Sequence, residues 1–128
     1  MADKIKILLV EDSIEDAKFA SIQLMQSFGE DHSLQITDYF SKASELIAED
    51  FFHLIILDLS LPDSRGLNTF RELLNSCNVP VIIYTGLTDE LIKADALKSG
   101  ASDYLIKGET PTGVLKQSIL STLERVGR

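Results

Sequence analysis

Residues 53–58 read HLIILD, a run of apolar side chains that ends in an aspartate. Two other segments have a similar form: residues 5–12, IKILLVED, end in two acids, and residues 79–85, VPVIIYT, end in a threonine. Short apolar runs bounded by polar residues are typical of strands that are buried on both faces. The three segments therefore predict the central strands of one sheet.

Segments with helical character separate these strands. Apolar residues recur there at intervals of three and four, Ser13 is placed as an N-cap, and Gly29 and Gly100 are placed to end helices. We expect Asp16 to reach back toward the helix start, as in a capping box. The expected helices cover residues 14–28, 43–47, 66–76, 88–99 and 111–126, and two shorter strands cover residues 34–40 and 104–107. This fivefold alternation predicts an α/β fold with a parallel sheet between two layers of helices.

Length, composition and charge indicate one acidic domain, residues 1–128. The hydrophobic fraction of 45% and the charged fraction of 25% are ordinary for a globular protein of this size. A net charge of −8 argues against binding to nucleic acid or to an anionic membrane surface. The apolar start is too short for a signal peptide, no stretch has the length of a membrane span, and Cys77 has no second cysteine. We therefore expect a cytoplasmic protein.

Three acids end strands that we expect to be neighbours: Glu11, Asp12 and Asp58. In parallel sheets of this class, ligand chemistry collects outside the carboxyl ends of the strands. Each acid alone could simply mark the chain leaving the core, but three acids at one edge repel one another unless a cation lies between them. Oxygen ligands in a wet site suit a hard divalent ion, and Mg²⁺ is favoured because it keeps several waters.

Thr85 and Lys107 lie at the ends of two further expected strands. A hydroxyl donor and an ammonium group beside a metal could stabilise the oxygens of a phosphoryl group. The carboxylate of Asp58 would then be the nucleophile that forms an acyl phosphate. Alone, Lys107 could be a solvated surface lysine and Thr85 an ordinary β-branched strand residue, so their joint placement is what indicates a site.

Taken in order, the segments ILLVED, LIILDLSLPDSRG, VIIYTG and GASDYLIKG resemble the receiver domain of response regulators in two-component systems. The resemblance covers essentially the whole chain. It implies a (βα)5 doubly wound fold of the flavodoxin/CheY-like type, whose five-stranded parallel sheet has the strand order 2-1-3-4-5. It also implies that a sensor histidine kinase or a histidine phosphotransfer protein phosphorylates the domain.

The resemblance also implies a role for each residue of the expected site. Asp58 would be the phosphoacceptor, and Thr85 and Lys107 would contact the phosphoryl group. The metal, Mg²⁺ or Mn²⁺, would have as protein ligands Glu11 through water, Asp12, Asp58 and the backbone carbonyl of Ser60.

How the signal leaves the site is implied in the same way. Thr85 would move to the phosphoryl group and Tyr104 would turn inward, which would alter the surface built from residues 88–99, 104–106 and 111–126. That surface would bind an unknown downstream protein or a fused output domain, and the phosphorylated form could dimerise. We expect no dedicated substrate turnover, so the protein is not an enzyme in the ordinary sense.

Two positions depart from the family pattern. Where the family usually has Lys-Pro, this chain has Lys107-Gly108, and we expect a trans peptide and a looser loop because a cis bond to glycine is costly. Ser60 and Leu87 differ from the polar pair found in some fast-dephosphorylating members. Since an apolar Leu87 cannot orient an attacking water, we predict a comparatively long-lived phosphorylated state.

Other functions fit the residues less well. A haloacid-dehalogenase-like phosphatase also forms an acyl phosphate, but it needs a second aspartate where this chain has Ser60. A flavodoxin-like flavin binder needs a phosphate loop after the first strand, where Glu11 and Asp12 would repel phosphate. A receiver-like module that binds a partner without phosphorylation stays open as the alternative.

Overall fold

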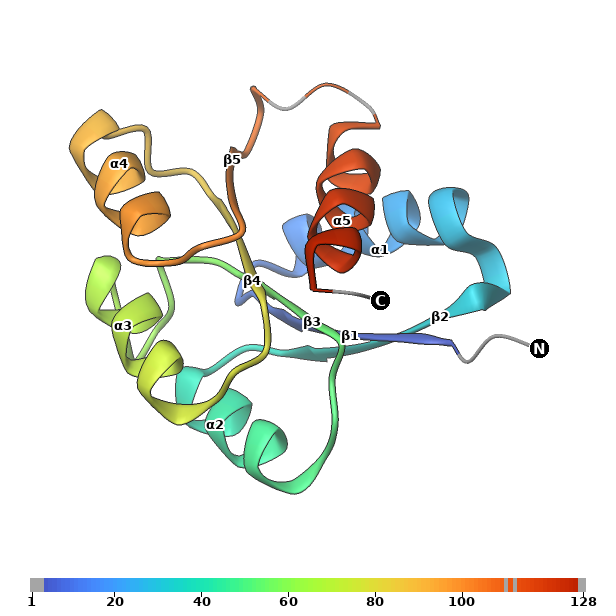
Figure 1. Ribbon diagram of the computed structural model, residues 1–128, viewed down its shortest axis with the longest axis horizontal. Helices are drawn as coiled ribbons and strands as arrows, with labels where there is room; N and C mark the ends of the chain where they lie inside the picture. The colour runs from blue at the N-terminus through green and yellow to red at the C-terminus, as the bar shows by residue number, and fades with distance from the viewer. Residues whose placement is uncertain (1–3, 110, 112, 127–128) are drawn as a thin grey trace.

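Five parallel strands form one sheet at the centre of the molecule (Figure 1). The computed structural model describes residues 4–109, 111 and 113–126. The strands are β1 (Ile5–Val10), β2 (His32–Thr37), β3 (Leu54–Leu57), β4 (Val81–Thr85) and β5 (Asp103–Ile106). They lie in the order β2-β1-β3-β4-β5, and each neighbouring pair is parallel. The predicted fold and strand order are confirmed.

Helices cover both faces of this sheet. They are α1 (Ile14–Phe28), α2 (Phe40–Glu49), α3 (Leu67–Ser76), α4 (Glu90–Lys98) and α5 (Val114–Arg125), with a short 3₁₀ turn, η1 (Gly29–Asp31), after α1. Figure 1 shows α1 and α5 on one side of the sheet and α2, α3 and α4 on the other. The buried side chains accordingly form two clusters, one on each face.

The central strands supply side chains to both clusters because successive residues of a strand point to opposite faces. In β3, Leu54 and Ile56 pack toward α1 and α5, whereas Ile55 and Leu57 pack toward α2, α3 and α4. All four side chains are fully buried. Burial on both faces explains why the strand is apolar throughout.

The boundary between β2 and α2 differs from the prediction. The pattern predicts a strand over residues 34–40, but β2 ends at Thr37 and α2 begins at Phe40. The carboxylate of Asp63 accepts hydrogen bonds from the backbone amides of Phe40, at 2.8 Å, and Ser41, at 3.0 Å. It therefore satisfies amides that an isolated helix start would leave unpaired. A cap that comes from 23 residues away leaves no local sequence signal.

The last two helices begin later than predicted. Asp89 accepts hydrogen bonds from amides of the first turn of α4, so this helix starts at Glu90. In front of α5, Gly113 has a φ of +94°, a left-handed conformation that favours glycine, and the helix starts at Val114. Thus α4 begins directly after its cap, Asp89, and α5 begins directly after the left-handed Gly113.

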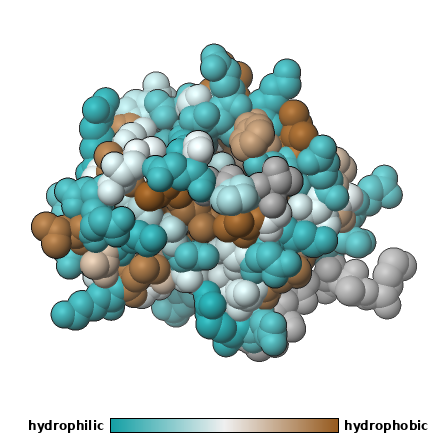
Figure 2. All heavy atoms as spheres, turned by 90° about the horizontal axis from the view of Figure 1, so that it is seen from above, coloured by the Kyte–Doolittle hydropathy of each residue, from teal (hydrophilic) through white to brown (hydrophobic). Residues whose placement is uncertain are grey.

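The surface carries both hydrophobic and hydrophilic side chains. Figure 2 shows a strip of hydrophobic atoms on one face, bordered by hydrophilic ones. Large exposed apolar residues also gather on α1, namely Ile14, Phe19, Ile22 and Met25. Of the helices in the described part of the chain, none is long and apolar enough to cross a membrane.

Candidate functional site

The carboxyl ends of β1, β3, β4 and β5 bring the predicted polar side chains to one edge of the sheet. Glu11 and Asp12 follow β1, Asp58 follows β3, Thr85 ends β4 and Lys107 follows β5. Parallel pairing aligns these ends, since Val10 pairs with Leu57 and Thr85 pairs with Ile106. All five residues therefore lie in one place, although they are spread over almost the whole chain.

The three acids form a cluster that could hold a metal ion. Glu11, Asp12 and Asp58 each offer a carboxylate oxygen, and these oxygens lie within 4.8 Å of one another. Glu11 and Asp58 are buried, whereas Asp12 is exposed. A set made only of carboxylate oxygens, with one ligand open to water, fits a hard divalent cation.

The raised pKa of Glu11 also indicates a site for a cation. Burial raises the pKa of Glu11 to about 7, the ion pair with Lys107 opposes this rise, and the nearby negative charge of Asp58 adds to it. The charged form of a buried carboxylate beside a second carboxylate thus costs free energy. A divalent cation between them would remove that cost, so the residues present fit the metal that the sequence predicts.

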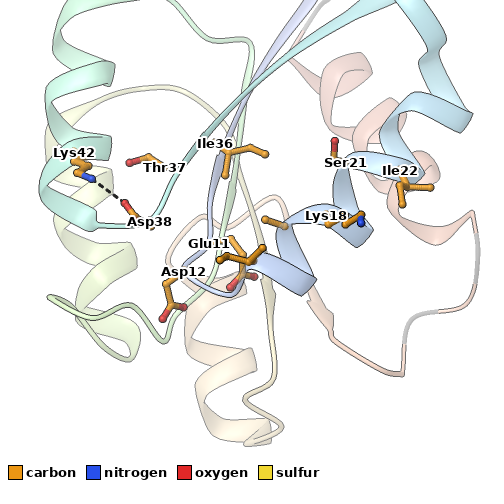
Figure 3. Close-up of a pocket in the computed structure, with 11 residues that line it drawn as sticks. Glu11, Asp12, Lys18, Ser21, Ile22, Ile36, Thr37, Asp38 and Lys42 are labelled. Atoms are coloured by element: carbon orange, nitrogen blue, oxygen red, sulfur yellow. Dashed lines mark hydrogen bonds and ion pairs between the residues drawn. The ribbon is translucent and has the colours of Figure 1, made fainter.

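A hollow opens beside these acids. It has a volume of about 640 Å³ and lies between α1 and the end of β2 (Figure 3). Glu11 and Asp12 line one end of it, and Lys42, paired with Asp38 at 3.1 Å, lines another. Asp12 and several residues of α1 thus line the same hollow.

The carboxylate of Asp58 is contacted on both oxygens. Its Oδ1 accepts a hydrogen bond from the hydroxyl of Thr85 at 2.8 Å and a longer one from the backbone amide of Ser60 at 3.3 Å. Its Oδ2 accepts from the ammonium of Lys107 at 3.0 Å. One side chain thus meets a neutral donor and a cation, and these are the two residues that the resemblance places at the phosphoryl group.

Lys107 is the cation shared by this edge of the sheet. Its Nζ forms ion pairs with Glu11, with Asp16 at 2.8 Å and with Asp58 at 3.0 Å. Burial by itself lowers the pKa of Lys107, but hydrogen bonds to Asp16, Glu11 and Asp58 together raise it above its usual range. The lysine is therefore charged, and its backbone amide is fixed by a 2.8 Å hydrogen bond to the carbonyl of Thr85.

Asp16 has a different partner from the one that its position in the sequence predicts. Ser13 does cap α1, because its hydroxyl accepts from the amide of Asp16 at 3.2 Å. The reverse contact of a capping box is wrong, since the amide of Ser13 donates to Glu11 at 3.1 Å and the carboxylate of Asp16 turns to Lys107. The sequence around Asp16 does not predict this contact, because Lys107 lies 91 residues further along the chain.

The loop after Asp58 is held by several contacts. Ser60 is exposed and forms an isolated bridge with Arg65, and the amide of Gly66 donates to the carbonyl of Leu59 at 2.7 Å. The side chain of Asp63, which caps α2, belongs to the same loop. The predicted carbonyl ligand, that of Ser60, thus lies in a loop whose backbone is tied together by these contacts.

Tyr104 lies in β5, buried in the cluster on the α2, α3 and α4 side. Its hydroxyl donates to the backbone carbonyl of Leu87 at 2.9 Å, and burial raises its pKa, so it stays a donor. The aromatic ring is thus already turned inward, and Thr85 already contacts Asp58. The peptide bond between Lys107 and Gly108 is trans, as predicted.

Comparison with known proteins agrees with this geometry. Residues 7–119 match the family model of the response regulator receiver domain. The chain belongs to the response regulator receiver family. The response regulator ArlR of Staphylococcus aureus is 34% identical over 103 residues, which cover 80% of this chain and 45% of ArlR. The receiver thus spans less than half the length of this curated relative.

Solved structures support the same assignment of the receiver fold. The BeF3-activated N-terminal receiver domain of Klebsiella pneumoniae RstA has a TM-score of 0.81 and 30% identity, covering 92% of this chain and 97% of that one. The signal receiver domain of a putative LuxO repressor protein from Vibrio parahaemolyticus has a TM-score of 0.85 and 28% identity, covering 97% and 93%. The chain is therefore a receiver of the kind that acts in two-component signalling.

Proposed function

We propose that Asp58 is the phosphoacceptor of this receiver and that it takes its phosphoryl group from a phosphohistidine of a partner protein. The observation that carries the proposal is the pair of contacts on its two oxygens, Thr85 at 2.8 Å and Lys107 at 3.0 Å. In the transfer, an oxygen of Asp58 bonds to phosphorus while the bond between phosphorus and the histidine nitrogen breaks. Thr85 and Lys107 then offer a hydrogen bond and a positive charge to the phosphoryl oxygens.

The reaction requires a metal, and we propose Mg²⁺, with Mn²⁺ as a substitute. Its protein ligands would be Glu11 through water, Asp12, Asp58 and the backbone carbonyl of Ser60. The three carboxylate oxygens within 4.8 Å support this set. When bound, the ion neutralises charge on the phosphoryl oxygens, which two buried carboxylates would otherwise repel.

The partner is a sensor histidine kinase or a histidine phosphotransfer protein, and it docks on α1. Ile14 and Ile22, with 85% and 47% of their surface exposed, present an apolar side next to the hollow of Figure 3. Such a face suits a helix of the partner, because apolar side chains at helical spacing pack into one another. A phosphohistidine on that helix would reach Asp58 past the exposed Asp12.

Phosphorylation is read out on the surface formed by α4, β5 and α5. Thr85 and Tyr104 link that surface to the acceptor, since Thr85 contacts Asp58 and the hydroxyl of Tyr104 binds the loop in front of α4. A downstream protein, a fused output domain or a second copy of the chain would bind there. We propose that residues 1–128 act as one cytoplasmic receiver domain without turnover of a separate substrate.

Intact mass spectrometry tests the proposal. The wild type and Asp58→Asn are incubated with Mg²⁺ and acetyl phosphate, a donor whose phosphorus–oxygen bond breaks to release acetate. We expect one added phosphoryl group on the wild type, none on the variant, and none on the wild type when a chelator removes the metal. A folded wild type that takes no label from any donor would instead support the module that binds its partner without phosphorylation.

A further inference from the structure

Asp16 places a carboxylate at the phosphoacceptor site that does not belong to the metal cluster. Its Oδ2 accepts from Nζ of Lys107 at 2.8 Å, a shorter contact than the 3.0 Å between Lys107 and Asp58. The cluster that could hold a metal consists of Glu11, Asp12 and Asp58 and leaves Asp16 out. Asp16 lies in the first turn of α1, so the ammonium is tied to a helix as well as to the strand ends.

Lys107 needs such a restraint in this chain. A lysine side chain is long and flexible, and it acts as a point charge that must be held in place by its partners. The backbone of Lys107 is fixed by Thr85, but the chain continues with Gly108, at a φ of +80°, where the family pattern has proline. Restraint of the ammonium therefore comes from carboxylates, and its ion-pair partners among the described residues are Glu11, Asp16 and Asp58.

Two of these three partners have another task. Glu11 and Asp58 belong to the cluster that could hold a metal, where a bound cation would share their negative charge and would repel the ammonium of Lys107. Asp16 lies outside the cluster, so a bound cation would not compete for its carboxylate. Its side chain is 46% exposed, whereas that of Lys107 is 18% exposed. We propose that Asp16 is a positioning residue that retains the Lys107 ammonium beside Asp58 when the metal is bound. This inference rests on the proposed function and extends it.

The test compares Asp16→Ala and Asp16→Asn with Glu15→Ala. Glu15 is the neighbouring acid in the same first turn, so its removal changes the charge at the start of α1 equally, but Glu15 is not among the ion-pair partners of Lys107. The first readout is the NMR signal of the Lys107 ammonium, recorded without metal and in saturating Mg²⁺, and assigned with Lys107→Met. The second is the initial rate of phosphorylation by acetyl phosphate in saturating Mg²⁺.

We expect Asp16→Ala to speed hydrogen exchange at the Lys107 ammonium and to slow phosphorylation about three- to fivefold. A factor of this size corresponds to the free energy that a partly exposed ion pair contributes. Asp16→Asn keeps an oxygen acceptor and should fall between, and Glu15→Ala should match the wild type in both readouts. An unchanged ammonium signal in saturating Mg²⁺, or an unchanged rate despite faster exchange, would overturn the positioning role. If the wild type is not phosphorylated, the proposed function is wrong. The ammonium signal then still decides whether Asp16 holds Lys107.

Discussion

The hydroxyl of Thr85 donates a hydrogen bond of 2.8 Å to Oδ1 of Asp58, and both residues are buried at the ends of neighbouring strands. The backbone carbonyl of Thr85 also accepts from the amide of Lys107 at 2.8 Å. Thr85 therefore contacts Asp58 through its side chain and Lys107 through its main chain. A shift of this residue must change both β4 and the start of the loop after β5.

Replacement of the Thr85 hydroxyl should slow phosphorylation. Thr85→Val keeps the shape of the buried side chain but removes the donor, so we expect a rate about tenfold lower, since hydrogen bonds to charged groups are stronger than neutral ones. Thr85→Ser keeps the hydroxyl and should stay close to the wild type. The rates come from intact mass spectrometry over time with acetyl phosphate. Equal rates for Thr85→Val and wild type would show that the bond does not serve the reaction.

Tyr104 should carry the response from the acceptor to α4 and α5. Tyr104→Ala removes the ring from the core, so we expect much smaller amide shifts in α4 and α5 when beryllofluoride is added, with shifts near Asp58 retained. Tyr104→Phe loses only the 2.9 Å bond to the Leu87 carbonyl and should keep most of the response. NMR spectra with and without beryllofluoride give both results. A full response in Tyr104→Ala would refute the coupling.

Leu87 should set a long lifetime for the phosphorylated form. Its side chain packs against the core cluster on the α2, α3 and α4 side and offers no group to orient water. Leu87→Asn supplies such a group while leaving the main-chain carbonyl that binds Tyr104, so we expect loss of the phosphoryl group to become several times faster. Leu87→Met is the apolar control and should keep the wild-type lifetime. Rapid loss of label from the wild type in Mg²⁺ contradicts this prediction.

Asp63 should stabilise the fold in a pH-dependent way. Hydrogen bonds from the amides of Phe40 and Ser41 lower the pKa of Asp63 below its usual value of 3.8. An acid whose pKa is lower in the folded state stabilises it fully above 3.8 and loses that effect as the pH falls through the lowered value. Denaturation midpoints of Asp63→Ala should therefore lie below wild type at neutral pH, and the difference should shrink below pH 3.8. A difference that is constant with pH would mean that the charged cap contributes nothing.

The sequence was sufficient to predict the sheet and most of the site because the relevant signals are local. Four apolar residues at 54–57 mark a strand buried on both faces, and an acid directly after it marks the edge where ligands bind. The contacts of Asp16 and Asp63 could not be predicted in this way. Each joins residues that are distant in the chain, Lys107 in one case and the start of α2 in the other. Such contacts follow from the packing of helices on the sheet, which no short segment encodes.

Locating the acyl phosphate tests most directly whether Asp58 is the phosphoacceptor. Wild-type protein is treated with acetyl phosphate and Mg²⁺, reduced with borohydride, which converts a phosphorylated aspartate into homoserine, and digested for tandem mass spectrometry. We predict homoserine at position 58, and none there when the donor is omitted or a chelator is added. Homoserine at position 12 or at another acid, with position 58 unmodified, would contradict the assignment of Asp58 as the phosphoacceptor.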